Sequence, residues 1–283
     1  ELRFVHIAGT NGKGSTAAMI SSVLTSAGYS TGLFTSPYIE RFNERIQISG
    51  ECISDNELAC IVSHIKNIME THECFVSEFA LDLAAALIYF KSRKCDIVVL
   101  ETGLGGKLDA TNVIEKSISV ITSVSLDHTE YLGDTIEKIT LDKAEIIKPD
   151  GYTILYSQNK ESVKDIIKKK CESVGSQLYI SDSPVIKANG ILSCKGMDIH
   201  VPLAGNYQFF NAMTAIKTIE ILQKEGFSIS AKNISEGISK VKWPVRFEYL
   251  SDKLIVDGAH NPDAVEKLCV SLSALNIDIL PVI

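Results

Sequence analysis

The first residue of the sequence whose neighbours suggest a chemical role is Lys13, which stands between two glycines in the stretch AGTNGKGST at 8–16. A segment at 3–7 that is typical of a short buried strand precedes this stretch, and a segment at 17–27 with apolar residues at helical spacing follows it. A turn from a strand into a helix presents backbone N–H groups and the positive end of the helix dipole to an anion. The pattern therefore indicates a phosphate-binding turn.

Glycines in such a turn let phosphate oxygens approach the backbone, and a lysine there can reach the β and γ phosphates of a nucleotide. The stretch departs from the general P-loop pattern, because the first glycine would fall at Ile7 and Gly14 follows the lysine. An ordinary strand–helix turn is the alternative interpretation. The position of Lys13 between strand and helix favours a nucleoside triphosphate site.

Polar residues also follow two apolar runs, at 96–100 and 117–123, that are typical of central parallel strands. Glu101 comes directly after the first run, and Asp127 and His128 come shortly after the second. Ligands of open α/β sheets bind beyond the carboxyl ends of the strands. A carboxylate there suits magnesium beside phosphates, whereas a helix-capping glutamate and a structural histidine are the alternatives.

Strands and helices alternate along most of the chain, which predicts an α/β fold with a mainly parallel sheet covered on both faces. Expected strands lie at 3–7, 30–35, 96–100, 117–123 and 152–156, and expected helices at 17–27, 54–73, 77–91, 161–174 and 211–225. Short alternating stretches between Val185 and Pro202 predict a small antiparallel insert. Lys143 lies in a helical segment, where a lysine is ordinarily solvated.

The stretch 241–248 has no regular period and contains a proline and the only tryptophan, which is typical of a domain junction. After it come a predicted strand at 254–256, a turn at 257–262 and a helix at 263–275, the opening of a second α/β unit. We therefore expect an ATP-binding domain at 1–245 and the beginning of a second, truncated domain at 246–283. The apolar residues at 280–283 resemble the start of a further strand, so both ends of the sequence look trimmed.

Composition narrows the class of protein. The 283 residues are 45% hydrophobic and carry a formal net charge of −7, which argues against nucleic acid or an anionic membrane as the main partner. Seven scattered cysteines without a C-x-x-C pair favour reduced thiols over disulfides or a zinc site. No apolar run is long enough to cross a membrane and no secretory signal opens the chain, so we expect a cytoplasmic location.

Six stretches taken together are similar to the folylpolyglutamate synthase/dihydrofolate synthase family of the Mur ligase superfamily. They are GTNGKGS at 9–15, TSPYIERFNERI at 35–46, ETGLGGKLDATN at 101–112, LDHTEYLG at 126–133, Lys143 with its IIKP tail, and DGAHNP at 257–262. Muramyl-peptide ligases share the first stretch but usually carry a threonine or serine after its lysine. Gly14 and the segment at 36–38 therefore favour the folate branch.

The resemblance implies a P-loop Mur-ligase-type domain followed by the start of a Rossmann-like domain that completes a glutamate ligase. It implies ATP-dependent amide bond formation, in which a carboxylate of folate or dihydropteroate becomes an acyl phosphate that the amine of L-glutamate attacks. ATP and Mg²⁺ are the implied cofactors. The expected partners are these small molecules, and we expect a monomer.

The resemblance also implies roles for individual residues, with Lys13, Lys143 and His128 as the catalytic ones. Nucleotide contacts are implied for Thr10, Asn11, Gly12, Lys13, Gly14, Ser15, Thr16, Asn211, Arg246, Asp257 and His260. Magnesium ligands are implied at Ser36, Glu101 and His128, and acceptor contacts at Ser77, Glu78, Phe79, Ala80, Leu108, Asp109 and Ala110. Lys143 matches a lysine that is carbamylated in this family, a change that turns a cation into an anion able to help hold a second metal.

Some positions depart from the residues that are usual in the family. Ala80 replaces a carboxylate, Leu83 a threonine, Glu145 a glycine, Tyr207 a histidine and Val245 a glycine. These departures leave two alternatives open, another Mur-type ligase and a non-catalytic ATP-binding relative. Glu145 could either repel a carbamate on Lys143 or help to hold metal.

Overall fold

The computed structural model describes residues 2–187 and 190–275 of the chain. Its centre is an eight-stranded sheet in the order β4-β3-β2-β5-β1-β6-β7-β8. The parallel strands are β1 (Arg3–Ala8), β2 (Thr31–Phe34), β5 (Ile97–Glu101), β6 (Ile118–Ile121), β7 (Tyr152–Leu155) and β8 (Gln177–Ile180). An antiparallel hairpin of β3 (Ile46–Ile48) and β4 (Glu51–Cys52) extends one edge.

The remaining elements of the described residues are helices and two small antiparallel sheets. The helices are α1 (Lys13–Ser26), α2 (Asp55–Thr71), α3 (Glu78–Ser92), α4 (Thr129–Leu132), α5 (Ile136–Lys143), α6 (Glu161–Val174), α7 (Tyr207–Lys224), α8 (Ala231–Ser239) and α9 (Pro262–Ser273), with 3-10 turns η1 (Phe42–Arg45), η2 (Ala110–Val113) and η3 (Ala144–Ile146). The small sheets are β9 (Val185–Ile186), β10 (Ile191–Cys194) and β11 (Met197–His200), and the hairpin of β12 (Glu248–Ser251) and β13 (Leu254–Val256). In this part of the chain no helix is both long enough and apolar enough to cross a membrane.

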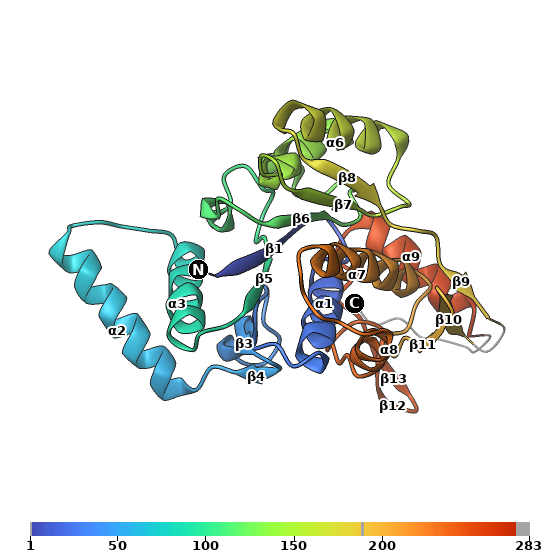
Figure 1. Ribbon diagram of the computed structural model, residues 1–283, viewed down its shortest axis with the longest axis horizontal. Coiled ribbons are helices and arrows are strands. Elements are labelled where there is room, and N and C mark those ends of the chain that lie inside the picture. Colours follow the sequence, from blue (N-terminus) through green and yellow to red (C-terminus); the bar gives the residue numbers. More distant parts are fainter. Residues whose placement is uncertain (1, 188–189, 276–283) are drawn as a thin grey trace.

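Each face of the large sheet has its own core, because successive side chains of a strand point to opposite faces. Val5 and Ile7 of β1 pack on one face with α1, α7 and α8. Leu100 of β5 packs on the other face with α3, and Ile121 of β6 packs with α5 and α6. Figure 1 shows these two groups of helices on either side of the strands. This is the packing that a buried parallel sheet requires.

The local sequence explains where α2 and α3 begin. Ser54 and Ser77 are their N-caps, and each side chain accepts a hydrogen bond at 3.3 Å from a backbone N–H group, of Glu57 and Ala80 respectively. α2 extends away from the sheet (Figure 1), and Ile65 is its buried residue. The local capping residues therefore define where these two helices begin, independently of tertiary packing.

The predicted α/β architecture and the antiparallel insert are confirmed, and some boundaries are wrong. α7 begins at Tyr207, one turn before the predicted start at Asn211, and α1 begins at Lys13 rather than Ala17. β8, the β3–β4 hairpin, α4, α8 and β12 were not predicted from the sequence. The strand expected at 280–283 lies outside the described residues.

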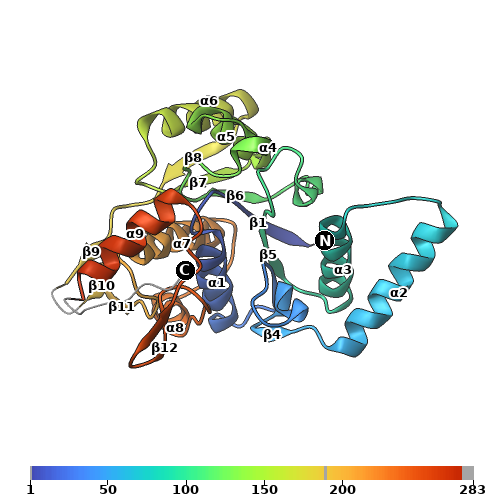
Figure 2. The same ribbon diagram turned by 180° about the vertical axis from the view of Figure 1, so that it is seen from behind.

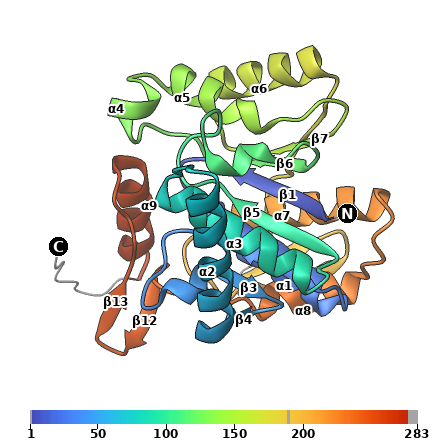
Figure 3. The ribbon, with the colours of Figure 1, turned by 90° about the vertical axis from the view of Figure 1, so that its left-hand side faces the viewer.

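The carboxyl ends of the parallel strands lie on the side of the molecule where α4 and α9 are found (Figure 3). α9 follows the β12–β13 hairpin, and the two lie together at one side of the molecule (Figure 2). Residues from the last quarter of the chain therefore lie near the carboxyl ends of β1 and β5.

His6 is a polar residue of β1 on the face opposite to Val5 and Ile7. Its side chain is fully buried, with Nε2 2.7 Å from Oγ1 of Thr111. Burial, with the positive charge of Lys148, lowers the pKa of His6 to about 3. The ring is therefore neutral in the folded protein at neutral pH.

We expect the free energy of unfolding to decrease as the pH falls from 6.5 toward about 3, with His6 contributing up to about 1.4 kcal/mol per pH unit. In this window the unfolded chain binds a proton at His6 and the folded chain does not, so acid favours unfolding. Above pH 6.5 neither state is protonated and the contribution vanishes. Urea unfolding at several pH values measures the slope, with His6→Gln as the variant that cannot titrate. Equal slopes for the two proteins would contradict the assignment.

Candidate active site

The turn between β1 and α1 is shaped by glycine. Gly12, with φ of 85°, is in the left-handed region and precedes the first residue of α1, where no side chain caps the helix. A Cβ at Gly12 would lie 2.6 Å from Oδ1 of Asn211. The N–H groups of Thr10 and Asn11 donate to the carbonyl oxygen of Ser123 at 2.7 and 3.2 Å, which ties the turn to the end of β6. The uncapped first turn of α1 can therefore bind an anion.

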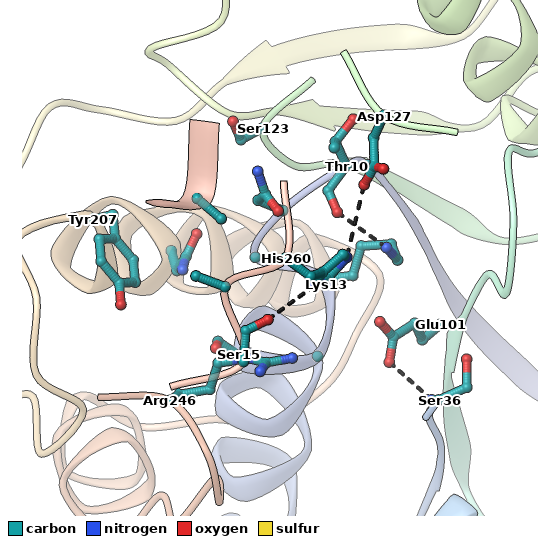
Figure 4. Close-up of a pocket in the computed structure, with 18 of the residues that line it drawn as sticks. Thr10, Lys13, Ser15, Ser36, Glu101, Ser123, Asp127, Tyr207, Arg246 and His260 are labelled. Carbon is teal, nitrogen blue, oxygen red and sulfur yellow. Dashed lines mark hydrogen bonds and ion pairs between the residues drawn. The ribbon is translucent and has the colours of Figure 1, made fainter. Parts of the chain in front are cut away.

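This turn borders a cavity of about 200 Å³ (Figure 4). The expected site residues that line it are Thr10, Asn11, Gly12, Lys13, Gly14, Ser15, Ser36, Glu101, His128, Lys143, Asn211, Arg246, Asp257 and His260. Lys13 stands between Glu101 and Ser36 on one side and Arg246 on the other (Figure 4). Its Nζ donates to the carbonyl oxygen of Thr10 at 3.2 Å and forms no ion pair within the described residues. The charge of Lys13 is thus available to a phosphate.

Glu101 is the last residue of β5, and its carboxylate is buried beside the phosphate turn. The residue is 4% exposed, and the backbone N–H of Ser36 donates to Oε2 at 3.2 Å. Burial raises the pKa of Glu101 above its ordinary value, although the charge of Lys13 and the hydrogen bond from Ser36 act in the opposite direction. A buried carboxylate with such limited pairing is suited to a cation.

The donor set suits Mg²⁺ better than a transition metal. No three histidine, cysteine, aspartate or glutamate side chains come together as a metal cluster in residues 2–187 and 190–275. Mg²⁺ commonly takes one or two carboxylates and completes its coordination with water and phosphate oxygens. Glu101 and the hydroxyl of Ser36 fit this coordination preference, because both residues line the cavity beside Lys13.

His128 also lines this cavity, at the N-terminal boundary of α4, where its φ of 47° lies in the left-handed region. Its side chain is half exposed, with Nε2 3.9 Å from Oδ1 of Asp127. Oδ2 of Asp127 accepts a hydrogen bond from Nδ2 of Asn261 at 2.9 Å and lies 3.8 Å from Nε2 of His260. Asp127 therefore joins the end of β6 to the turn before α9.

Lys143 is buried, and the expectation of an ordinary solvated lysine is wrong. The residue is 3% exposed, and Nζ donates to the carbonyl oxygen of Gly9 at 2.9 Å. Burial, with the nearby positive charge of Lys13, lowers the pKa of Lys143 to about 7. A substantial share of the amine is therefore neutral at physiological pH, which is the form that can react with CO₂.

The two carboxylates next to Lys143 in sequence are both engaged elsewhere. Glu145 pairs with Lys170 of α6, with Oε1 2.9 Å from Nζ. Oδ1 of Asp142 accepts hydrogen bonds from the N–H groups of Gly106 and Lys107 at 2.8 and 3.4 Å. The departure at Glu145 thus places no free carboxylate against the Lys143 amine.

The N-terminus of α9 contacts the phosphate turn directly, a contact that was not predicted from the sequence. Nδ2 of Asn11 donates to Oδ2 of Asp263 at 2.8 Å and to Oδ1 of Asn261 at 3.2 Å. Lys267 lines the cavity, and its Nζ contacts Asp263 at 2.8 Å and Oγ of Ser123 at 3.3 Å. The available signal was the spacing of Asp263 and Lys267, which puts both on one face of a helix directly after DGAHNP.

Another part of the cavity wall is formed by Tyr207, the first residue of α7, and by Arg246 and Asp257, which flank the β12–β13 hairpin. Asp257 accepts hydrogen bonds from the N–H groups of Phe247 at 2.7 Å and Ala259 at 2.8 Å. Burial and the charge of Asp257 raise the pKa of Tyr207 to about 12, so its phenol stays protonated. Tyr207 and Tyr156 both line the cavity and were not predicted as site residues. Tyr156 directly follows β7, the same kind of position that pointed to polar residues after β6.

Some predicted site residues do not line this cavity. Thr16 is buried inside α1, and its Oγ1 has no hydrogen-bond partner in the described part of the chain. Ser77, Glu78, Phe79 and Ala80 form the start of α3, and Leu108, Asp109 and Ala110 belong to the loop after β5. The Phe79 ring fills the space beside Gly103, where a Cβ would lie 2.7 Å from the ring.

A second cavity of about 230 Å³ adjoins the first and shares Gly14, Ser36, Pro37, Glu101 and Arg246 with it. Trp243 forms part of its wall and explains the glycine after Lys13. A Cβ at Gly14 would lie 2.9 Å from the Trp243 ring. The threonine or serine that other ligases carry at this position has no room here.

The chain matches known proteins over most of its length. Residues 7–219 match the Mur ligase middle domain. The dihydrofolate synthase/folylpolyglutamate synthase of Bacillus subtilis is 39% identical over 292 residues, which cover 96% of this chain and 68% of that protein. The dihydrofolate synthetase of Saccharomyces cerevisiae is 36% identical over 287 residues, covering 94% of this chain and 66% of that protein.

Solved structures agree with this match. An FPGS–AMPPCP–folate complex superposes with a TM-score of 0.89 at 35% identity, covering 97% of this chain and 72% of that chain. E. coli FolC in complex with DHPP and ADP superposes with a TM-score of 0.86 at 30% identity, covering 98% of this chain and 66% of that chain. The chain therefore belongs to the folylpolyglutamate synthase/dihydrofolate synthase family and contains the Mur ligase middle domain.

Proposed function

We propose that this protein is an ATP-dependent ligase that joins the amino group of L-glutamate to a carboxylate of folate or dihydropteroate. The observation that carries the proposal is that the Lys13 turn, buried Glu101 and buried Lys143 line one cavity. The relatives support it, since they are named for this chemistry and include complexes with AMPPCP and folate and with DHPP and ADP.

In the first step, a carboxylate oxygen of the acceptor attacks the γ-phosphorus of ATP while the bond from phosphorus to the ADP oxygen breaks. The products are an acyl phosphate and ADP. The backbone N–H groups of the turn hold the phosphates, and Lys13 stabilises the negative charge of the transferring group. The hydrogen bonds from Asn11 of the turn to Asn261 and Asp263 keep this arrangement in place.

In the second step, the glutamate amine attacks the acyl carbon and forms a tetrahedral intermediate. The bond from carbon to the phosphate oxygen then breaks, and inorganic phosphate leaves with the proton that the nitrogen loses. Arg246, Asp257 and His260 come from the part of the chain after 245, which we propose is the opening of a second domain that brings groups to the nucleotide.

Ser36, Glu101 and His128 are the residues that would hold Mg²⁺, which would neutralise charge on the phosphate oxygens when bound. We also propose that Lys143 is carbamylated. Its neutral amine adds to CO₂, forms a nitrogen–carbon bond and releases a proton, which leaves an anion near Gly9. The acceptor would bind at Ser77, Glu78, Phe79, Ala80, Leu108, Asp109 and Ala110, beside the cavity rather than inside it.

The test of the function is phosphate release by the full-length protein with ATP, magnesium, L-glutamate and a panel of acceptors. We expect release that depends on both glutamate and either dihydropteroate or a reduced folate. Release only with a cell-wall precursor would assign another Mur-type reaction. ATP binding without release for any acceptor would assign a non-catalytic relative.

Lys13→Ala tests the phosphate turn. It removes a charge-assisted contact worth about 1.5–3 kcal/mol, so we expect ATP binding or turnover at subsaturating ATP to fall roughly 10- to 150-fold. Lys232→Ala is the matched control, because that exposed lysine pairs with Glu236 on α8 and does not line the cavity. Unchanged turnover of Lys13→Ala at subsaturating ATP would argue against the assignment of the turn.

A further inference from the structure

The loop that follows Glu101, residues 102–112 (the glycine-rich loop), is closed by hydrogen bonds to one side chain. Oδ2 of Asp109 accepts from the N–H of Leu104 at 2.8 Å, and Oδ1 accepts from the N–H of Thr111 at 2.9 Å. Oδ1 also accepts from the hydroxyl of Thr111 at 2.5 Å. Both oxygens of the Asp109 carboxylate thus accept hydrogen bonds from within the loop, so this side chain holds the shape of the loop.

The contact between Thr111 and His6 ties this closed loop to the central strand. A threonine hydroxyl has a single hydrogen, and the carboxylate of Asp109 has none to give. The hydroxyl of Thr111 therefore donates to Asp109, and its oxygen accepts from Nε2 of His6 at 2.7 Å. His6 must carry its hydrogen on Nε2. Consistently, its buried Nδ1 has no hydrogen-bond partner within the described residues.

Burial makes this chain of contacts costly to break. Thr111 and His6 are both fully buried, so no water is available to replace a lost partner. His6 also projects from a strand that pairs on both sides within the parallel sheet, which makes it a rigid anchor. The sheet therefore fixes Thr111, and Thr111 fixes the carboxylate that closes the loop.

The glycine-rich loop has other anchors, which hold different atoms. Asp142 of α5 accepts from the N–H groups of Gly106 and Lys107. Asn112 accepts from Nζ of Lys148 at 2.8 Å and donates to the carbonyl oxygen of Lys107 at 3.3 Å. The N–H of Asn112 also donates to the carbonyl oxygen of Asp109 at 2.9 Å, but neither anchor touches the Asp109 carboxylate. The contact from His6 through Thr111 is therefore the side-chain route by which the sheet holds that carboxylate.

We infer that His6 is a positioning residue for the acceptor, which acts through Thr111 and Asp109 on the part of the glycine-rich loop at 108–110. The inference rests on the proposed function, because it takes the acceptor to bind at this loop. The phosphate turn follows β1, the strand that carries His6, but it makes its own contacts to Ser123. Loss of the anchor should therefore weaken acceptor binding and leave ATP binding intact.

The experiment compares KM for the acceptor, KM for ATP and kcat in the full-length protein. Thr111→Val keeps the shape and removes the hydroxyl, and His6→Leu removes the ring donor. For both we expect KM for the acceptor to rise about 10-fold while KM for ATP changes less than about twofold. Thr111→Ser and His6→Gln retain a hydroxyl and an N–H donor and should restore most of the acceptor affinity.

Thr153→Val is the matched control, because Thr153 of β7 is another fully buried threonine of the sheet. Its hydroxyl lies 2.8 Å from Oγ of Ser176 and does not contact the glycine-rich loop. It should lower the free energy of unfolding without raising KM for the acceptor. An acceptor KM that is unchanged in Thr111→Val, or that rises equally with KM for ATP, overturns the positioning role. So does an equal rise of the acceptor KM in Thr153→Val.

Nitrogen-15 NMR of the histidine rings measures the tautomer of His6 directly and does not depend on enzyme activity. His6 should show a protonated Nε2 and an unprotonated Nδ1 at neutral pH, and the Nε2 resonance should shift in Thr111→Val. The opposite tautomer overturns the inference even in an active enzyme. A parent protein without ligation for any acceptor would instead overturn the proposed function, whatever the ring resonances show.

Discussion

Lys143→Ala is expected to lose most of the ligase activity, by about 100-fold, and to regain part of it when acetate or formate is added. The proposed carbamate is an anion, so this change removes a negative charge and leaves open the space that the lysine side chain occupied. Removing a side chain that supports a metal site typically lowers metal affinity or activity 10- to 100-fold. The charge of the carbamate would also act on the phosphates. A small carboxylate can enter that space and restore the charge.

Lys143→Met is the matched control for this rescue. It fills the space with an uncharged chain of similar length, so activity should fall as far and added formate should not restore it. Incubation with ¹³C-labelled bicarbonate should give a carbamate signal in the parent that both variants lack. An intact Lys143 ammonium in a high-resolution structure with magnesium and nucleotide bound would rule out the carbamate and leave the Glu101 site untouched.

Glu101→Gln should raise the magnesium concentration needed for half-maximal activity by at least about 10-fold. Glutamine keeps the volume and can still accept the hydrogen bond from the N–H of Ser36, so the change removes little except the negative charge. A magnesium titration of activity at saturating ATP measures the effect. Because the carboxylate is buried and unpaired by a salt bridge in the described residues, the neutral variant should be at least as stable as the parent.

Glu145→Gln is the matched control for Glu101→Gln. Its carboxylate pairs with Lys170, and its loss should not move the magnesium titration. Overlapping titration curves for Glu101→Gln and the parent would mean that Glu101 has a structural role. A shift of the same size in Glu145→Gln would mean that the titration reports net charge rather than a specific ligand.

Much of the architecture was predictable because its signals are local. The strand at 3–7, the glycine turn and the helix after it were predicted from the glycines and from the helical spacing at 17–27, which neighbouring residues define without help from the rest of the chain. The starts of α2 and α3 follow from Ser54 and Ser77 for the same reason. β8 was missed because its side chains are only half-buried, and α8 because it is short, so neither has a long apolar pattern.

The sequence by itself also determined that Lys13 and Glu101 lie at the same site, since parallel strands bring their carboxyl ends to one edge of the sheet. Only the tertiary structure decided that Lys143 is buried, that Glu145 turns to Lys170, and that α9 reaches the phosphate turn. The hydrogen bond between His6 and Thr111, which are 105 residues apart, was likewise decided only by the tertiary structure. Burial and pairing depend on which surfaces meet after the chain folds, and no local pattern encodes a contact over such a separation.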